Sequence, residues 1–111
     1  MIKSNSGSII NLSSSAAIDG NEGRSAYAGS KAALIAFSKV ISREFSRYKI
    51  RVNCIAPGLT DTDMMNESTP KESIKKVIDE IASKRIANPE EIANLIAFLG
   101  SERSSYINGQ T

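Results

Sequence analysis

The residues best suited to chemistry are Tyr27 and Lys31, a phenol and an amine four positions apart. On a helix, positions i and i+4 lie one above the other on the same face. A free phenol titrates near ~10 and exchanges protons poorly at neutral pH, but an ammonium group one turn away favours the phenolate. Such a tyrosine can exchange a proton with a C–O oxygen, which is half of a carbonyl/alcohol redox reaction. The same pair also arises by chance on many helices, so its spacing alone leaves both interpretations open.

The other half of that reaction is a hydride, which no side chain supplies and a nicotinamide cofactor does. Two further groups of residues could complete the site. The serines of residues 13–15 follow one predicted strand, and Pro57 and Gly58 follow another. Serines after a strand are more often turn or cap residues than catalytic groups. However, parallel α/β sheets place their active sites at the carboxyl ends of strands, so we expect these segments to meet there.

Two strands and a helix must position these residues. Residues 8–12 and 50–56 are short, apolar runs bounded by turn residues, which predicts strands. Between them, residues 25–48 contain no proline and repeat apolar side chains at helical spacing. One helical face is therefore predicted to be buried, with the residues Ala33, Phe37, Val40, Ile41 and Phe45. A strand, a long crossover helix and a second strand form a right-handed parallel βαβ unit.

Two more helices and a turn are predicted in the second half of the chain. Residues 70–83 should form a helix that buries Ile74, Val77, Ile78 and Ile81. The next helix has an N-cap, a first-turn proline, a capping-box glutamate and a terminating glycine, namely Asn88, Pro89, Glu91 and Gly100. Residues 106–111 are predicted to turn into a third strand.

Composition excludes several classes of function. The 111 residues include no histidine and one cysteine, Cys54. This excludes a Ser-His-Asp or Cys-His catalytic group and an internal disulfide, and we expect no metal site. A net charge of +2, from 14 basic and 12 acidic residues, predicts no nucleic-acid partner. No apolar run approaches the ~20 residues of a membrane span, and no secretory signal is visible, so we expect a cytoplasmic protein without membrane association.

Three motifs together resemble the short-chain dehydrogenase/reductase family. They are GSIINLSS at residues 7–14, YAGSK at residues 27–31 and VNCIAPG at residues 52–58. The family's catalytic serine lies thirteen residues before its tyrosine, which is Ser14 in this sequence. The resemblance implies that Ser14 orients the substrate and that Tyr27 is the catalytic acid/base. It also implies that Lys31 assists the tyrosine and binds the nicotinamide ribose.

The segment after the second predicted strand is similar to the family's PGxxxT loop, which surrounds the nicotinamide carboxamide. Thr60 stands where the family usually has isoleucine or valine, and the contact made there uses the main chain. The resemblance thus implies an oxidoreductase that uses NADP or NAD to interconvert a small-molecule carbonyl and a secondary alcohol. The residues that it implies for cofactor binding are Tyr27, Lys31, Pro57, Gly58, Thr60 and Thr62.

Within the family, PGLTDTDM at residues 57–64 most resembles the 3-oxoacyl-carrier-protein reductase branch. This implies a 3-oxoacyl thioester substrate, an acyl-carrier protein as a partner and the family's usual homo-oligomer, a tetramer. That branch docks its carrier protein on basic residues near the start of the first strand. This chain has Lys3 there, but Asn5 and Ser6 are uncharged.

The resemblance also predicts the fold: α/β, as the C-terminal half of a doubly wound, Rossmann-type parallel-sheet domain. The seven glycines do not form the family's TGxxxGxG turn, and its NNAG segment is also missing. We therefore expect residues 1–111 to be a partial domain that lacks the N-terminal dinucleotide-binding half and the last strand. The alternative is a truncated, inactive piece that associates with itself or a partner through an unpaired strand edge.

Overall fold

The computed structural model describes residues 1–111, apart from the side chain of Ser68. Its centre is a pair of parallel strands, β1 (Gly7–Leu12) and β2 (Ile50–Ile55). The remaining elements are α1 (Ala16–Asp19), α2 (Ser25–Phe45), η1 (Ser46–Tyr48), α3 (Asp63–Ser68), α4 (Lys71–Glu80), α5 (Pro89–Gly100) and η2 (Glu102–Ser104).

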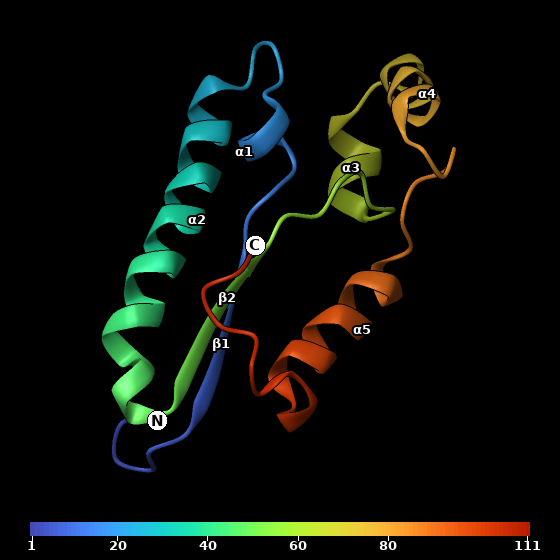
Figure 1. The fold of residues 1–111 in the computed structure, drawn as a ribbon. Coiled ribbons are helices and arrows are strands. Elements are labelled where there is room, and N and C mark those ends of the chain that lie inside the picture. The colour runs from blue at the N-terminus through green and yellow to red at the C-terminus, as the bar shows by residue number, and fades with distance from the viewer.

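The two strands and α2 form the predicted βαβ unit. Gly7 lies opposite Ile50 and Leu12 opposite Ile55, so the strands pair along their whole length. α2 packs against both strands, and α5 packs against β1 from the other side (Figure 1). The predicted α/β class with a parallel sheet is confirmed.

Residues 107–110 lie along the edge of β2 that faces away from β1. The Gly109 N–H donates to the Val52 carbonyl at 2.8 Å, and the Cys54 N–H donates to the Gln110 carbonyl at 2.8 Å. The side-chain oxygen of Asn108 accepts the Val52 N–H at 2.8 Å. The sequence predicts that residues 106–111 turn into a third strand. Gly109 and Gln110 form the backbone bonds of such a strand, but the Val52 N–H is bonded to the side chain of Asn108 and not to a backbone carbonyl. β2 is therefore bonded on both edges, and within the described residues β1 pairs with a strand on one edge only.

The face of α2 that packs on the sheet contains Ile41 and Phe45, as predicted, and also two serines that were not predicted there. Its buried residues are Ser38, Ile41 and Ser42, and Phe45 packs partly buried against the core beside them. The small serines bring the helix close to the sheet, and their hydroxyls donate to carbonyls of α2 itself, at 2.7 Å and 2.8 Å. Their burial therefore leaves no hydroxyl without a partner.

The predicted buried positions Phe37 and Val40 are wrong. Their side chains are 53% and 55% exposed, and Ala33 is exposed as well. A periodicity of apolar residues cannot reveal this, because it gives serine no weight as a helix residue that packs on a sheet.

The later helices agree with the sequence to different degrees. α4 ends at Glu80, three residues before the predicted end, and the side chains of Ile74, Val77 and Ile78 are half-buried. α5 has the predicted bounds. Its capping box is complete: the Asn88 side chain accepts the Glu90 N–H at 3.1 Å, and the Glu91 carboxylate accepts the Asn88 N–H at 2.8 Å. The difference arises because α5 has specific signals at both ends, whereas α4 has a proline at its start and no stop signal at its end.

Gly109 is expected to tolerate no side chain. Its φ is +71°, and a Cβ there would lie 2.7 Å from Oγ of Ser42. We expect Gly109→Ala to lower the free energy of unfolding by roughly 2–4 kcal/mol, from left-handed backbone strain together with overpacking. Urea denaturation measures this loss.

Gly20 provides a matched control, because its φ is +73° but a Cβ there would meet nothing within 4 Å. Gly20→Ala should cost only the backbone part, about 1 kcal/mol. Adding Ser42→Ala to Gly109→Ala should recover part of the steric cost. Equal losses for the two glycine variants would contradict the role of Ser42.

Candidate active site

The segments that follow β1 and β2 run side by side at the carboxyl edge of the sheet. The Ser13 N–H donates to the Ile55 carbonyl at 2.8 Å, and the Ser15 N–H donates to the Pro57 carbonyl at 2.9 Å. Ser14 lies between these two bonds, so it is held beside the start of the Pro57–Gly58 segment. The structure thus brings together two of the groups that the sequence predicts to meet.

The first turns of α2 are attached to the same edge. The ammonium group of Lys31 donates to the Leu12 carbonyl at 3.0 Å. In the opposite direction, the Ser13 hydroxyl donates to the backbone carbonyl of Lys31 at 2.8 Å. Ser13 is buried, with 5% of its surface exposed. These two bonds fix the Lys31 side chain and its backbone relative to the end of β1.

Tyr27 lies one turn before Lys31 on the same face of α2. The Lys31 nitrogen is 5.8 Å from the centroid of the tyrosine ring, within the range of a cation–π contact. The tyrosine is 44% exposed, so a bound molecule can reach it from solvent. The predicted Tyr–Lys pair is therefore formed, next to the segment that carries Ser14.

The Ser14 side chain forms a hydrogen bond within its own turn. Its half-buried hydroxyl accepts the Ala16 N–H at 3.3 Å. This is the turn role expected of a serine after a strand. A hydroxyl that accepts one bond retains a proton, with which it can donate to another oxygen.

The threonines after Pro57 and Gly58 have structural partners within their own segment. The Thr60 hydroxyl donates to the Gly58 carbonyl at 3.1 Å, and its backbone forms a parallel bridge with Ala87. The Thr62 hydroxyl accepts the Met65 N–H at 3.3 Å and caps α3. A Cβ at Gly58 would meet nothing within 4 Å, so there is open space beside the backbone at this residue.

Ser13 is a residue whose positioning role the sequence did not predict. It stands in a run of three serines, of which the spacing to Tyr27 singles out Ser14 alone. The alternation of side chains along a strand could have suggested that neighbouring serines point to opposite sides. Its partner, the Lys31 carbonyl, is known only from the folded structure.

Comparison with known proteins identifies the family of the chain. All 111 residues match the family described as Enoyl-(Acyl carrier protein) reductase. The 3-oxoacyl-[acyl-carrier-protein] reductase of Chlamydia trachomatis is 48% identical over 113 residues, and that of Thermotoga maritima is 43% identical over 110 residues. The chain belongs to the short-chain dehydrogenase/reductase family.

A solved member of the short-chain dehydrogenase/reductase family has the same fold. The crystal structure of 3-oxoacyl-[acyl-carrier protein] reductase from Brucella melitensis superposes with a TM-score of 0.93 at 33% identity. The superposition covers 100% of this chain and 41% of the Brucella melitensis chain. The chain likewise covers 44% of each of the two relatives named above, and 99% of it is matched.

The side chains that meet at this edge of the sheet can transfer protons and form hydrogen bonds. They are a hydroxyl, a phenol and an ammonium group, from Ser14, Tyr27 and Lys31, whereas the buried Ser13 hydroxyl is already bonded to the Lys31 carbonyl. Within the described part of the chain, no group of three or more acidic or cysteine side chains is placed to hold a metal ion. No described helix is long and apolar enough to cross a membrane.

Proposed function

We propose that this chain carries the catalytic half of an NAD(P)-dependent oxidoreductase that reduces 3-oxoacyl thioesters to secondary alcohols. The observation that supports it is the attachment of α2 to the end of β1 through Lys31. This attachment puts the Tyr27–Lys31 face beside the serine that the family motif assigns to catalysis. The relatives named as 3-oxoacyl-[acyl-carrier-protein] reductases support the thioester substrate.

In the proposed reaction, three side chains act on the carbonyl oxygen of the substrate. Ser14 donates a hydrogen bond to it and orients it. Tyr27 transfers its phenolic proton to it while the carbonyl carbon receives a hydride, so that the C=O bond becomes CH–OH. Lys31 places a positive charge beside the phenol and so stabilises the phenolate that remains. A bound nicotinamide cofactor in its reduced form, NADPH or NADH, would supply the hydride and would be oxidised to NADP or NAD.

The residues proposed to hold this cofactor fit a flat, polar group. The exposed face of Tyr27 and the ammonium group of Lys31 would meet the ribose and the nicotinamide. The open backbone at Gly58 would admit the carboxamide, together with Pro57, Thr60 and Thr62. In the same proposal, an acyl-carrier protein presents the thioester, residues 1–111 form one partial domain, and the assembled protein is a homo-oligomer.

The proposal is tested with the purified chain, acetoacetyl thioester and either NADPH or NADH. We expect oxidation of one of the two cofactors, in step with consumption of the thioester. Oxidation that continues without thioester would point to a different reaction. If the folded chain oxidises neither cofactor, the chain by itself is the inactive piece of the alternative prediction.

A further inference from the structure

Residues 61–86, here called the excursion, leave the sheet edge after β2 and return to it just before α5 (Figure 1). They carry α3 and α4. The elements that pack closely on one another are β1, β2, α1, α2, α5 and the two 3-10 turns. Among the described residues, α3 and α4 are not part of this group, although Met65 of α3 is buried, with 7% of its surface exposed.

The two ends of the excursion are bonded to each other. Thr60 and Ala87 form a parallel bridge, in which the Ala87 N–H donates to the Leu59 carbonyl at 3.0 Å. The Asp61 N–H donates to the Ala87 carbonyl at 2.9 Å. The excursion thus joins the rest of the molecule through one short stem, which consists of residues 59–61 and Ala87. The position of the excursion depends on how this stem is held.

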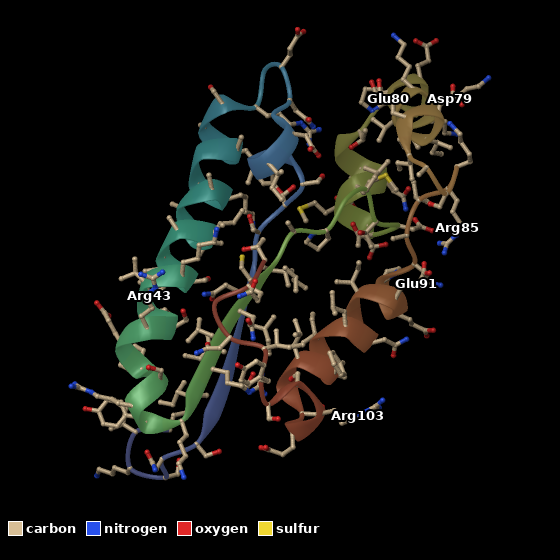
Figure 2. All side chains as sticks on the ribbon, viewed as in Figure 1. Arg43, Asp79, Glu80, Arg85, Glu91 and Arg103 are labelled. Atoms are coloured by element: carbon tan, nitrogen blue, oxygen red, sulfur yellow. The ribbon has the colours of Figure 1, made fainter. Side chains whose placement is uncertain are left out.

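An ion pair ties the stem to α5. Both terminal nitrogens of Arg85 donate to the Glu91 carboxylate, at 2.6 Å each (Figure 2). The same carboxylate accepts the Asn88 N–H as part of the α5 capping box. The hydrogen bond from the Arg85 guanidinium and, next, the bond from the Asn88 backbone lower the pKa of Glu91 to about 2. Glu91 therefore stays ionised at neutral pH and connects the excursion to the first turn of α5.

An open groove of about 230 Å³ lies beside the stem, lined by residues that include Leu59, Ile81 and Glu91. Leu59, Ile81 and Ala87 are half-buried, so side-chain packing supports the stem in part. The polar bonds of Arg85, Glu91 and the bridge hold the stem together with this packing.

We propose that Arg85 and Glu91 are a positioning pair, which fixes the excursion relative to α5 and so sets its distance from the carboxyl end of β2. Without the pair, the excursion moves about its stem while the sheet stays intact. The inference rests on the proposed function in one respect only, that the substrate binds at the carboxyl end of β2, where the excursion begins.

Amide hydrogen exchange of Glu91→Gln tests the pair in the intact chain. Glutamine keeps an oxygen for the α5 cap but removes the charge that Arg85 binds. We expect the Asp61 and Ala87 amides to exchange roughly two- to five-fold faster, the range for the loss of an exposed ion pair. Arg85→Gln should give the same result. The Cys54 and Gly109 amides, which lie in the sheet, should be unchanged.

Glu90→Gln is the matched control, because it removes a neighbouring charge from the same helical turn and leaves the ion pair in place. It should leave the Asp61 and Ala87 amides at their wild-type rates. Unchanged stem amides in both Arg85→Gln and Glu91→Gln would overturn the inference. Equal acceleration of stem and sheet amides would overturn it too, since the pair would then support the whole fold.

The exchange measurement needs no substrate, so its result stands whether or not the thioester assay succeeds. The link to substrate has its own readout, the comparison of KM with kcat in Glu91→Gln. We expect KM to rise with little change in kcat, because the substituted pair touches no reacting atom. An unchanged KM, with faster stem exchange, would overturn the link to substrate and leave the positioning of the excursion supported.

Discussion

Tyr27→Phe should lower the rate of 3-oxoacyl thioester reduction by roughly 10²–10⁴-fold, the contribution typical of a positioned acid or base. The substitution removes the phenolic oxygen and retains the ring, which is 44% exposed on the surface of α2. No core contact is lost, so the fold should be unaffected. The loss of NADPH absorbance, measured with saturating acetoacetyl thioester, gives the rate.

Tyr106→Phe is the control for this experiment. Its side chain is fully exposed after η2, so loss of its hydroxyl should change neither the rate nor the stability. Wild type and both variants should unfold at the same temperature, which separates an effect on chemistry from one on folding. Full activity in Tyr27→Phe would remove the tyrosine from the proposed mechanism.

Asn53→Ala should have the largest effect on stability, a loss of roughly 2–5 kcal/mol in the free energy of unfolding. Asn53 is 1% exposed. Its side-chain amide donates to the Ile107 carbonyl at 2.9 Å and accepts the Gln110 N–H at 3.0 Å. Alanine would leave two backbone groups without these partners and open a small cavity. Urea denaturation followed by circular dichroism measures the change.

Asn66→Ala is the comparison for Asn53→Ala. Asn66 is exposed and donates to the carboxylate of Asp61 at 3.0 Å, where water can replace it. Its loss should cost less than about 0.5 kcal/mol. If Asn53→Ala also costs less than 1 kcal/mol, about the net value of one hydrogen bond, residues 107–110 are not held by this side chain in solution.

The sequence predicted most accurately those elements that carry signals at their ends. α5 begins at Pro89 and ends at Gly100 as predicted, because its cap, its proline and its glycine each act within one turn. β1 and β2 were found within one residue, because each is a short apolar run bounded by turn residues. These are local effects, which need no knowledge of the rest of the fold.

The missed features depend on contacts between distant parts of the chain. Phe37 was expected in the core, but the sheet takes Ser38 and Ser42 instead, since only small side chains let α2 approach so closely. Asn53 is buried and Asn108 half-buried, and the side chain of each bonds to backbone groups about fifty-five positions away. Periodicity and propensity contain no information about such partners.

The candidate site was predicted at the level of segments. Spacing and motif placed Ser14, Tyr27 and Lys31 on two neighbouring segments, which the structure brings to one edge of the sheet. Their assigned roles remain predictions. The bond from Lys31 to the Leu12 carbonyl was not predicted, because it depends on how α2 lies against the end of β1 in the folded chain.

The pairing of β2 has a consequence for how the chain folds. Gly7 pairs with Ile50, so the first sheet contact closes a loop of 43 residues, and the bonds on the other edge of β2 come from Gly109 and Gln110. Contacts so distant in sequence are slow to form, because the chain loses entropy before they stabilise it. α2 and α5 can form early as local structures. The sheet between them is the late, cooperative step, so the rate of folding is set by the meeting of three distant segments.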